Sequence, residues 1–232
     1  MSYNVLFFGL LAYVCVSALV EARARILQGT AESDDSSFRF AERIAPSRHR
    51  RSLRFGKLLS GRPLNENQAN RLVFEHNNFR KMVPASNMER VYWDPQLAAS
   101  AQRHAERCTF EHSKDRRGVG ENIWAAGYSN HKNAVKMWFD EVNDPNCGCG
   151  NVYKHCCGHF TQVVWATSAR IGCGKAECGH IAYAPGMRHV LVCHYVKQGN
   201  RYGKPAYIYS PDKPCGNCPA YAPNCVDGLC QP

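Results

Sequence analysis

Residues 158–168 read GHFTQVVWATS. Phe160 to Trp165 form a short apolar segment that we expect to be helical. Downstream, Ile171 to Ala176 and His189 to Val196 are strand candidates, and the second shows the alternation and β-branched residues typical of a half-buried strand. Ala184-Pro185-Gly186 predicts a turn between them. This part of the chain therefore predicts a short helix followed by two neighbouring strands.

Three longer helices are predicted upstream. The first starts at Asn65, which has Gln68 three residues later as in a capping box, and the second starts at Asp94-Pro95 with Asp as N-cap. The predicted helices cover about residues 65–83, 94–108 and 130–142, and a further strand covers 122–125. Helices and few strands in this order predict an α+β domain in which helices cover a small sheet.

The composition favours one domain with small appendages and an oxidising compartment. The chain has 232 residues, of which 44% are hydrophobic, 21% are charged and 13 are cysteine. A reducing cytosol would leave that many thiols unpaired, whereas an extracellular protein pairs them. An odd number of cysteines requires an explanation, because pairing consumes them two at a time.

The first 22 residues are interpreted as a signal peptide. Val5 to Val20 is almost unbroken apolar sequence, too short to span a bilayer comfortably, and Val20-Glu21-Ala22 matches a signal-peptidase site. An uncleaved anchor helix is the alternative. Cleavage after Ala22 would remove Cys15 and leave 12 cysteines, so we expect a secreted extracellular protein without a stable membrane span.

Residues 23–51 are interpreted as a propeptide that ends in a furin-type processing site, Arg48-His49-Arg50-Arg51. A basic solvated tail is the alternative. Cleavage after Arg51 leaves 22 Lys and Arg against 14 Asp and Glu, a net charge of +8. This charge suits acidic cell surfaces or sulfated glycans. No zinc finger or basic aromatic helix argues for nucleic acid.

Four side chains are candidates for chemistry: His112, Glu121, Glu141 and His159. Neutral imidazole nitrogen and carboxylate oxygen are good ligands for zinc or another divalent cation. Their separation along the chain does not bring them together by itself. The alternative is that each is a separate surface or buried polar residue.

Five segments together resemble the CAP superfamily of cysteine-rich secretory proteins, venom allergens and pathogenesis-related proteins. They are HNNFR (76–80), CTFEHS (108–113), GENI (120–123), GHFTQVVWATS (158–168) and VLVCHYVKQGN (190–200). The resemblance implies a three-layer α-β-α sandwich over residues 66–209. It also implies that His112, Glu121, Glu141 and His159 meet in a central cleft that can bind a cation. Lys197 and Arg201 depart from the family's last motif.

The resemblance also implies most of the disulfide pairing. It pairs Cys108 with Cys178 and Cys173 with Cys193. The cysteines at 147, 149, 156 and 157 crowd one loop, and we expect them to pair among themselves. Adjacent cysteines such as Cys156 and Cys157 do not easily bond each other, so they need different partners. A zinc knuckle is the alternative for this loop and for Cys215 with Cys218.

Residues 210–232 predict a separate disulfide-held tail with no core of its own. The segment 215–230, CGNCPAYAPNCVDGLC, resembles the hinge of cysteine-rich secretory proteins, which implies Cys215 with Cys225 and Cys218 with Cys230. The printed sequence stops at Pro232, before the cysteine-rich module to which channel block is attributed in venom relatives. The multibasic propeptide, the four-cysteine loop and the short hinge together look more like the branch named after peptidase inhibitors.

The function indicated is that of a monomeric, non-enzymatic binding or effector protein. The chain has no HExxH or GxSxG motif and no unpaired cysteine once all twelve are bonded. A metal-dependent peptidase is one alternative, and a venom or defence effector acting on a channel or receptor is another. Candidate ligands are a lipid or sterol, a sulfated glycan or a cell-surface protein. Trp124, Trp138 and Trp165 could contact such a ligand, but large aromatics are more often core residues.

Overall fold

The computed structural model describes residues 55–232. The predicted signal peptide (1–22) and propeptide (23–51), with their cleavage sites at Ala22 and Arg51, lie outside the described residues. None of the helices in residues 55–232 is long and apolar enough to cross a membrane.

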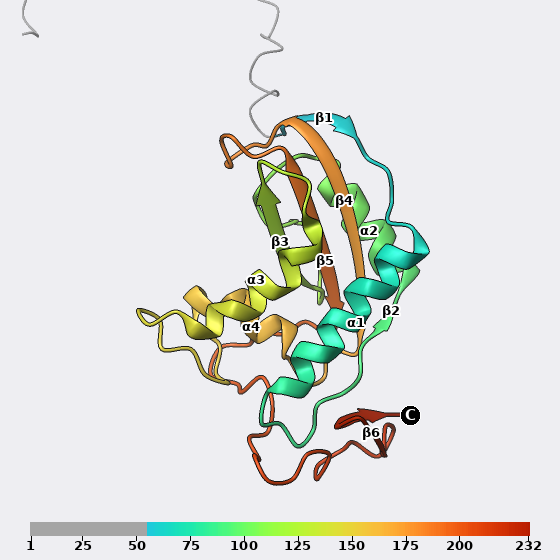
Figure 1. The fold of residues 1–232 in the computed structure, drawn as a ribbon, viewed down its shortest axis with the longest axis vertical. Coiled ribbons are helices and arrows are strands. Elements are labelled where there is room, and N and C mark those ends of the chain that lie inside the picture. Colours follow the sequence, from blue (N-terminus) through green and yellow to red (C-terminus); the bar gives the residue numbers. More distant parts are fainter. Residues whose placement is uncertain (1–54) are drawn as a thin grey trace, which may run out of the picture. The chain divides into compact units, whose positions relative to one another are not determined.

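A five-stranded sheet forms the middle of the domain (Figure 1). Its strands are β1 (Lys57–Ser60), β2 (Tyr92–Trp93), β3 (Gly120–Ala126), β4 (Arg170–His180) and β5 (His189–Val196). β5 lies between β3 and β4 and is antiparallel to both. β1 pairs antiparallel and β2 parallel with β4. Both short strands were missed from the sequence, because neither is long enough to show a strand pattern.

Four α-helices flank the sheet. They are α1 (Glu66–Met82), α2 (Pro95–Ala105), α3 (Ala134–Asp140) and α4 (Gly158–Val163). The capping box at Asn65 and the Asp94 N-cap are both present. α2 was predicted to reach Cys108 but ends at Ala105, because Cys108 has a φ of 50°, which an α-helix does not accommodate.

The helix predicted over 130–142 is three consecutive pieces. A 3₁₀ turn, η3 (His131–Asn133), precedes α3, and a second, η4 (Glu141–Asn143), follows it. A third, η5 (His155–Cys157), leads into α4. Glu141 therefore lies in a tight turn at the end of α3.

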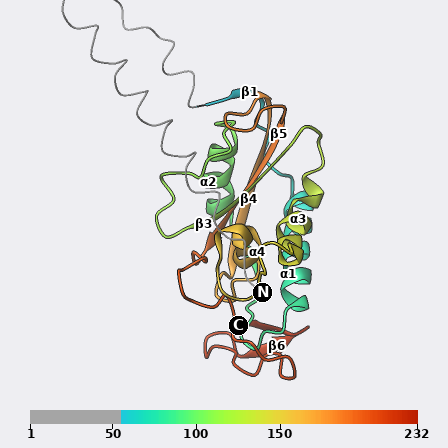
Figure 2. The ribbon, with the colours of Figure 1, turned by 90° about the vertical axis from the view of Figure 1, so that its left-hand side faces the viewer.

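The helices make three layers with the sheet, as predicted (Figure 2). α2 lies on one face, and α1, α3 and α4 lie on the other. α2 approaches the backbone of β4 at Gly172 and Gly174. A Cβ atom at Gly172 would lie 2.1 Å from the Ala98 nitrogen, and one at Gly174 would lie 2.3 Å from the Gln102 Cα. These two glycines therefore allow the contact between α2 and the sheet.

The apolar core is divided into two buried clusters. The larger includes Trp124, Trp138 and Trp165, whose exposed fractions are 4%, 3% and 6%. The smaller includes Ala101 and Ala105 of α2. The three tryptophans are therefore core residues, as their size favours.

Six disulfides connect the twelve cysteines of the described chain. The pairs are Cys108–Cys178, Cys147–Cys156, Cys149–Cys157, Cys173–Cys193, Cys215–Cys225 and Cys218–Cys230. Four of them are the pairs that the resemblance implies. The other two lie within the 147–157 loop, and each of the adjacent cysteines has its own partner.

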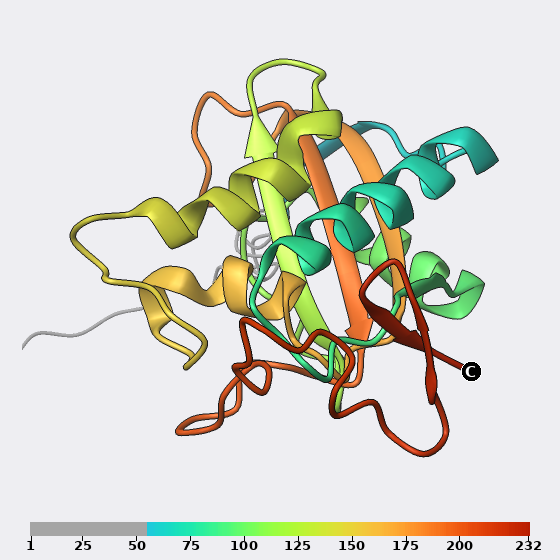
Figure 3. The same ribbon diagram turned by 60° about the horizontal axis from the view of Figure 1, so that its bottom comes forward.

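The C-terminal tail is not separate from the domain (Figure 3). It forms a hairpin of β6 (Asn224–Val226) and β7 (Leu229–Gln231). Leu229 is fully buried in the larger core cluster, and the Cys230 backbone N–H donates to the Met88 carbonyl at 2.8 Å. The prediction of a separate tail was wrong, because a Pro-, Gly- and Cys-rich composition does not reveal that Leu229 reaches the main core.

Candidate cation site

Glu121 lies on β3 with its carboxylate fully buried. Its Oε1 accepts hydrogen bonds from His112 Nδ1 at 2.6 Å and from the Ser113 backbone N–H at 2.9 Å. Its Oε2 accepts one from His194 Nε2 at 2.9 Å and lies 3.7 Å from His104 Nε2. Both carboxylate oxygens therefore accept hydrogen bonds, from the loop before β3 and from β5, whereas His104 of α2 donates its Nε2–H to the Glu111 carbonyl at 2.8 Å.

This environment keeps Glu121 ionised. Burial alone would raise its pKa, but the hydrogen bonds from His112 and His194 outweigh burial, and the pKa of Glu121 lies well below its usual range. Arg116 adds a positive charge, with its Nε 3.3 Å from Glu121 Oε1. Glu121 is therefore a buried anion and a weak base.

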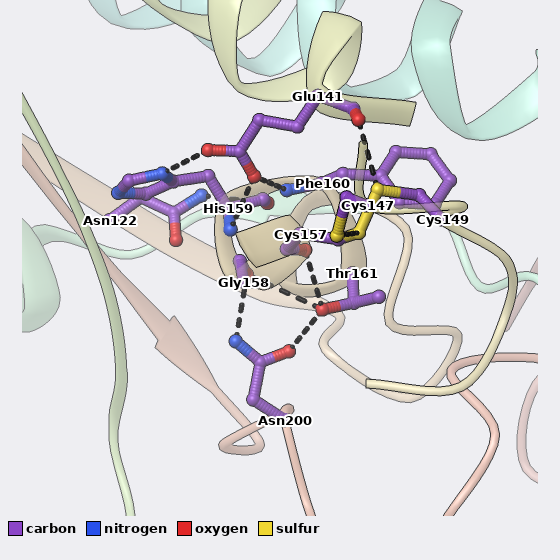
Figure 4. A network of polar contacts seen from close by, with 10 residues as sticks. All are labelled: Asn122, Glu141, Cys147, Cys149, Cys157, Gly158, His159, Phe160, Thr161 and Asn200. Carbon is purple, nitrogen blue, oxygen red and sulfur yellow. Dashed lines mark hydrogen bonds and ion pairs between the residues drawn. A yellow bond between two sulfur atoms is a disulfide. The ribbon is translucent and has the colours of Figure 1, made fainter. Parts of the chain in front are cut away.

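Glu141, at the start of η4, makes a second histidine–glutamate pair (Figure 4). Its Oε1 accepts a hydrogen bond from His159 Nδ1 at 2.5 Å. Its Oε2 accepts the backbone N–H groups of His159 at 2.9 Å and Phe160 at 3.0 Å. The carboxylate thus satisfies donors that the start of α4 would leave unpaired. The His159 ring also stacks on Trp138, with centroids 6.1 Å apart and planes 19° apart.

The disulfide-rich loop holds η4 against the start of α4. Cys149 is bonded to Cys157, which directly precedes α4, and Cys149 Sγ lies 3.0 Å from the Glu141 carbonyl oxygen (Figure 4). In residues 55–232, two groups of three cysteines have sulfurs within 4.8 Å of one another, and every member is in a disulfide. The structure therefore contradicts a zinc knuckle at these cysteines.

The structure brings the four predicted residues together as two pairs. His112 contacts Glu121 and His159 contacts Glu141, but within the described chain no three of these residues place ligand atoms within 4.8 Å of one another. Asn122, the neighbour of Glu121, donates from its Nδ2 to the His159 carbonyl at 3.1 Å. This contact ties the His159 backbone to β3.

The histidines of both pairs use Nδ1 for the carboxylate. That bond places the proton on Nδ1 and leaves the Nε2 lone pair as a ligand. Neither Nε2 atom hydrogen-bonds to another part of the described chain. The side chains of His112 and His159 are 56% and 33% exposed, whereas those of Glu121 and Glu141 are 0% and 24% exposed. Each imidazole is thus more accessible than the carboxylate that it contacts, and only the carboxylate of Glu121 is fully covered.

Three residues of this site were missed from the sequence: His194, His104 and Arg116. His194 is directly opposite Glu121 in the pairing of β3 with β5. The strand pattern identifies both segments, but strand register depends on contacts that one sequence does not reveal. His104 lies within the helix predicted over 94–108, but the helical pattern does not show which polar side chain approaches Glu121.

Comparison with known proteins supports the resemblance. A model of the cysteine-rich secretory protein family, CAP, matches residues 73–195. Protein lon-1 of Caenorhabditis elegans is 50% identical over 172 residues, which are 68% of this chain and 55% of that protein. Peptidase inhibitor 15 of Gallus gallus is 33% identical over 93% of this chain and 91% of its own length.

A solved structure shares the fold. The crystal structure of NaASP2 with Zn2+ matches with a TM-score of 0.58 at 25% identity, over 72% of this chain and 97% of that one. The α-β-α sandwich, the six disulfides and these similarities agree with one another. The chain belongs to the cysteine-rich secretory protein (CAP) family.

Proposed function

We propose that this chain is a secreted, non-enzymatic binding protein whose central site holds a divalent cation between the Nε2 atoms of His112 and His159. The observation that carries the proposal is that each imidazole donates Nδ1–H to a carboxylate. Such a contact fixes the ring and raises the basicity of the other nitrogen. Glu121 and Glu141 then orient the ligands rather than bind the cation themselves.

The donor set fits zinc or a similar transition metal. Two neutral imidazoles suit Zn²⁺, and water or a ligand oxygen would complete the coordination. The crystal structure of NaASP2 with Zn2+ is consistent with this choice of cation. When bound, the cation would supply a Lewis-acid contact for an anionic or carbonyl oxygen of a ligand. His112 and His159 would coordinate the cation, and Glu121 and Glu141 would hold the two imidazoles in place.

The state of the carboxylates favours binding over hydrolysis. A metal-dependent peptidase needs a base that can take a proton from water. Glu121 has a lowered pKa and both of its oxygens accept hydrogen bonds, as do both oxygens of Glu141.

The six disulfides support an extracellular location for the protein. A lipid, a sterol or a cell-surface protein stays a predicted ligand.

Titration calorimetry with ZnCl₂ tests the proposal. We expect one site in the unmodified protein and at least about tenfold weaker binding in His112→Ala and in His159→Ala, because each removes one ligand. His180→Ala, at an exposed position on β4, is the control and should bind as the unmodified protein does. Unchanged zinc affinity in both site variants would refute the cation site. Chelator-sensitive peptide cleavage by the pure protein would refute the non-enzymatic assignment.

A further inference from the structure

A second site lies outside the histidine–glutamate pairs. A cavity of about 330 Å³ is lined by the segment after β5 and by the residues that follow α4. Three of its lining residues are cationic: Lys197, Arg201 and Lys204. Largely buried Trp165 and Tyr207 form part of its wall. Its volume is at the lower end of the range for small-molecule sites.

The positive charge of this cavity is not compensated by the described chain. No acidic residue lines it, and residues 197–209, KQGNRYGKPAYIY, contain no Asp or Glu. Lys197, Arg201 and Lys204 make no ion pair with any carboxylate of residues 55–232, and all three are exposed. Three cations that converge on one hollow without a counterion attract an anionic ligand.

The loop that carries these cations is anchored at several points. The Gly199 backbone N–H donates to Gln162 Oε1 at 3.1 Å, and Ser168 Oγ donates to the Lys197 carbonyl at 2.6 Å. Asn200, which has a φ of 54°, donates from Nδ2 to the Gly158 carbonyl at 2.7 Å and accepts from Thr161 Oγ1 at 2.6 Å (Figure 4). The loop backbone is therefore fixed before a ligand arrives, which reduces the entropy lost on binding.

We propose that this cavity binds a sulfated glycan. Sulfo groups carry a permanent negative charge for the three cations to pair with. The amides of Asn87 and Gln198, which also line the cavity, offer donors and acceptors for sugar hydroxyl groups. The proposal does not depend on the cation site, because none of its residues is a histidine or glutamate of the two pairs.

Binding to immobilised heparin in 0.15 M NaCl tests this proposal, with the triple variant Lys197→Gln, Arg201→Gln and Lys204→Gln. We expect about tenfold weaker binding than in the unmodified protein, because three exposed charge contacts are lost. The control variant carries Lys57→Gln, Arg103→Gln and Lys114→Gln. These residues are exposed on β1, α2 and the loop before β3, so the control loses the same net charge. Its affinity should fall less than about twofold.

Three outcomes would overturn the proposal. The first is equal loss of affinity in the two triple variants, which would make heparin binding an effect of net charge. The second is undiminished binding to fully desulfated heparin. The third is binding to phosphatidylserine vesicles, but not to heparin, that the cavity variant alone loses. Zinc affinity in the same variants separates this proposal from the cation site, because we expect it to be unchanged in both.

Discussion

The two histidine–glutamate pairs differ in what holds the carboxylate. Glu121 is fully buried, and most of its contacts are side chains from α2, β5 and a loop. Glu141 is 24% exposed, and two of its three donors are backbone N–H groups at the start of α4. The difference teaches that one pair depends on the packing of the whole domain, whereas the other depends on one turn and the loop that holds it.

Replacing Glu121 should have the largest effect. In Glu121→Gln the buried anion is lost while His112, His194 and Arg116 keep their positions around it. We expect a loss of about 3–5 kcal/mol in the free energy of unfolding, because one partner of a buried charge network has been removed. Urea denaturation measures it, with exposed Glu111→Gln as control. A loss below about 1 kcal/mol would show that Glu121 is not held as described.

Removing the disulfide beside Glu141 should cost less. The Cys149–Cys157 bridge closes a short loop with a sequence separation of 8, so its removal by Ser substitution should cost about 2–3 kcal/mol. The matched control removes the Cys147–Cys156 bridge, which closes a loop of similar length but has an exposed cysteine at 156. Zinc affinity should fall more when Cys149–Cys157 is removed. The reverse order would contradict its role in holding Glu141.

A smaller effect is expected for Glu141→Gln. The amide keeps an acceptor for the start of α4 but loses the charge that His159 and the backbone N–H groups favour, so we expect a loss of about 1–2 kcal/mol. The neighbouring Asp140→Asn removes only an exposed pair with Lys136 and should cost less than about 0.5 kcal/mol. Equal losses in the two variants, measured by urea denaturation, would remove the distinction between them.

The smallest effect concerns pH. Because the pKa of Glu121 is lowered on folding, its contribution is complete above the unfolded value of about 4.3 and is lost as pH falls. Between pH 6 and 4 the unmodified protein should lose about 0.6 kcal/mol that Glu121→Gln does not lose. Burial lowers the pKa of His76 to about 4, so its stabilisation is also lost as pH falls from about 6.5, equally in both proteins.

Urea denaturation in EDTA at several pH values measures this difference. The contribution of His76 to the pH dependence is the same in both proteins, so it cancels when their free energies of unfolding are subtracted. If the difference between the free energies of unfolding of the two proteins stays constant from pH 6 to pH 4, then Glu121 is not an anion with a lowered pKa.

The sequence, with the family resemblance, predicted the three layers, the main strands and the four residues of the two histidine–glutamate pairs. It did not predict which residues contact one another within each pair. Capping at Asn65 and Asp94 is a local property, so those helices could be located in advance. The contact of His194 with Glu121 depends on strand register, and the packing of Leu229 against the core depends on where the tail turns. Such long-range contacts leave no trace in a single sequence.

The family resemblance supplied the grouping of four residues that spacing alone did not. The structure refines that grouping, because each glutamate contacts one of the two predicted histidines, and each of these imidazoles is more exposed than the carboxylate that it contacts. The expectation that the four residues meet in one cation-binding cleft thus becomes the proposal of two ligands and two orienting groups.

The most direct test of this account is anomalous diffraction at the zinc edge from crystals of the protein soaked in ZnCl₂. We expect one peak about 2.0–2.1 Å from the Nε2 atoms of His112 and His159, with Glu121 and Glu141 still bonded to Nδ1. A peak coordinated by either carboxylate, or one that involves neither histidine, would contradict the account.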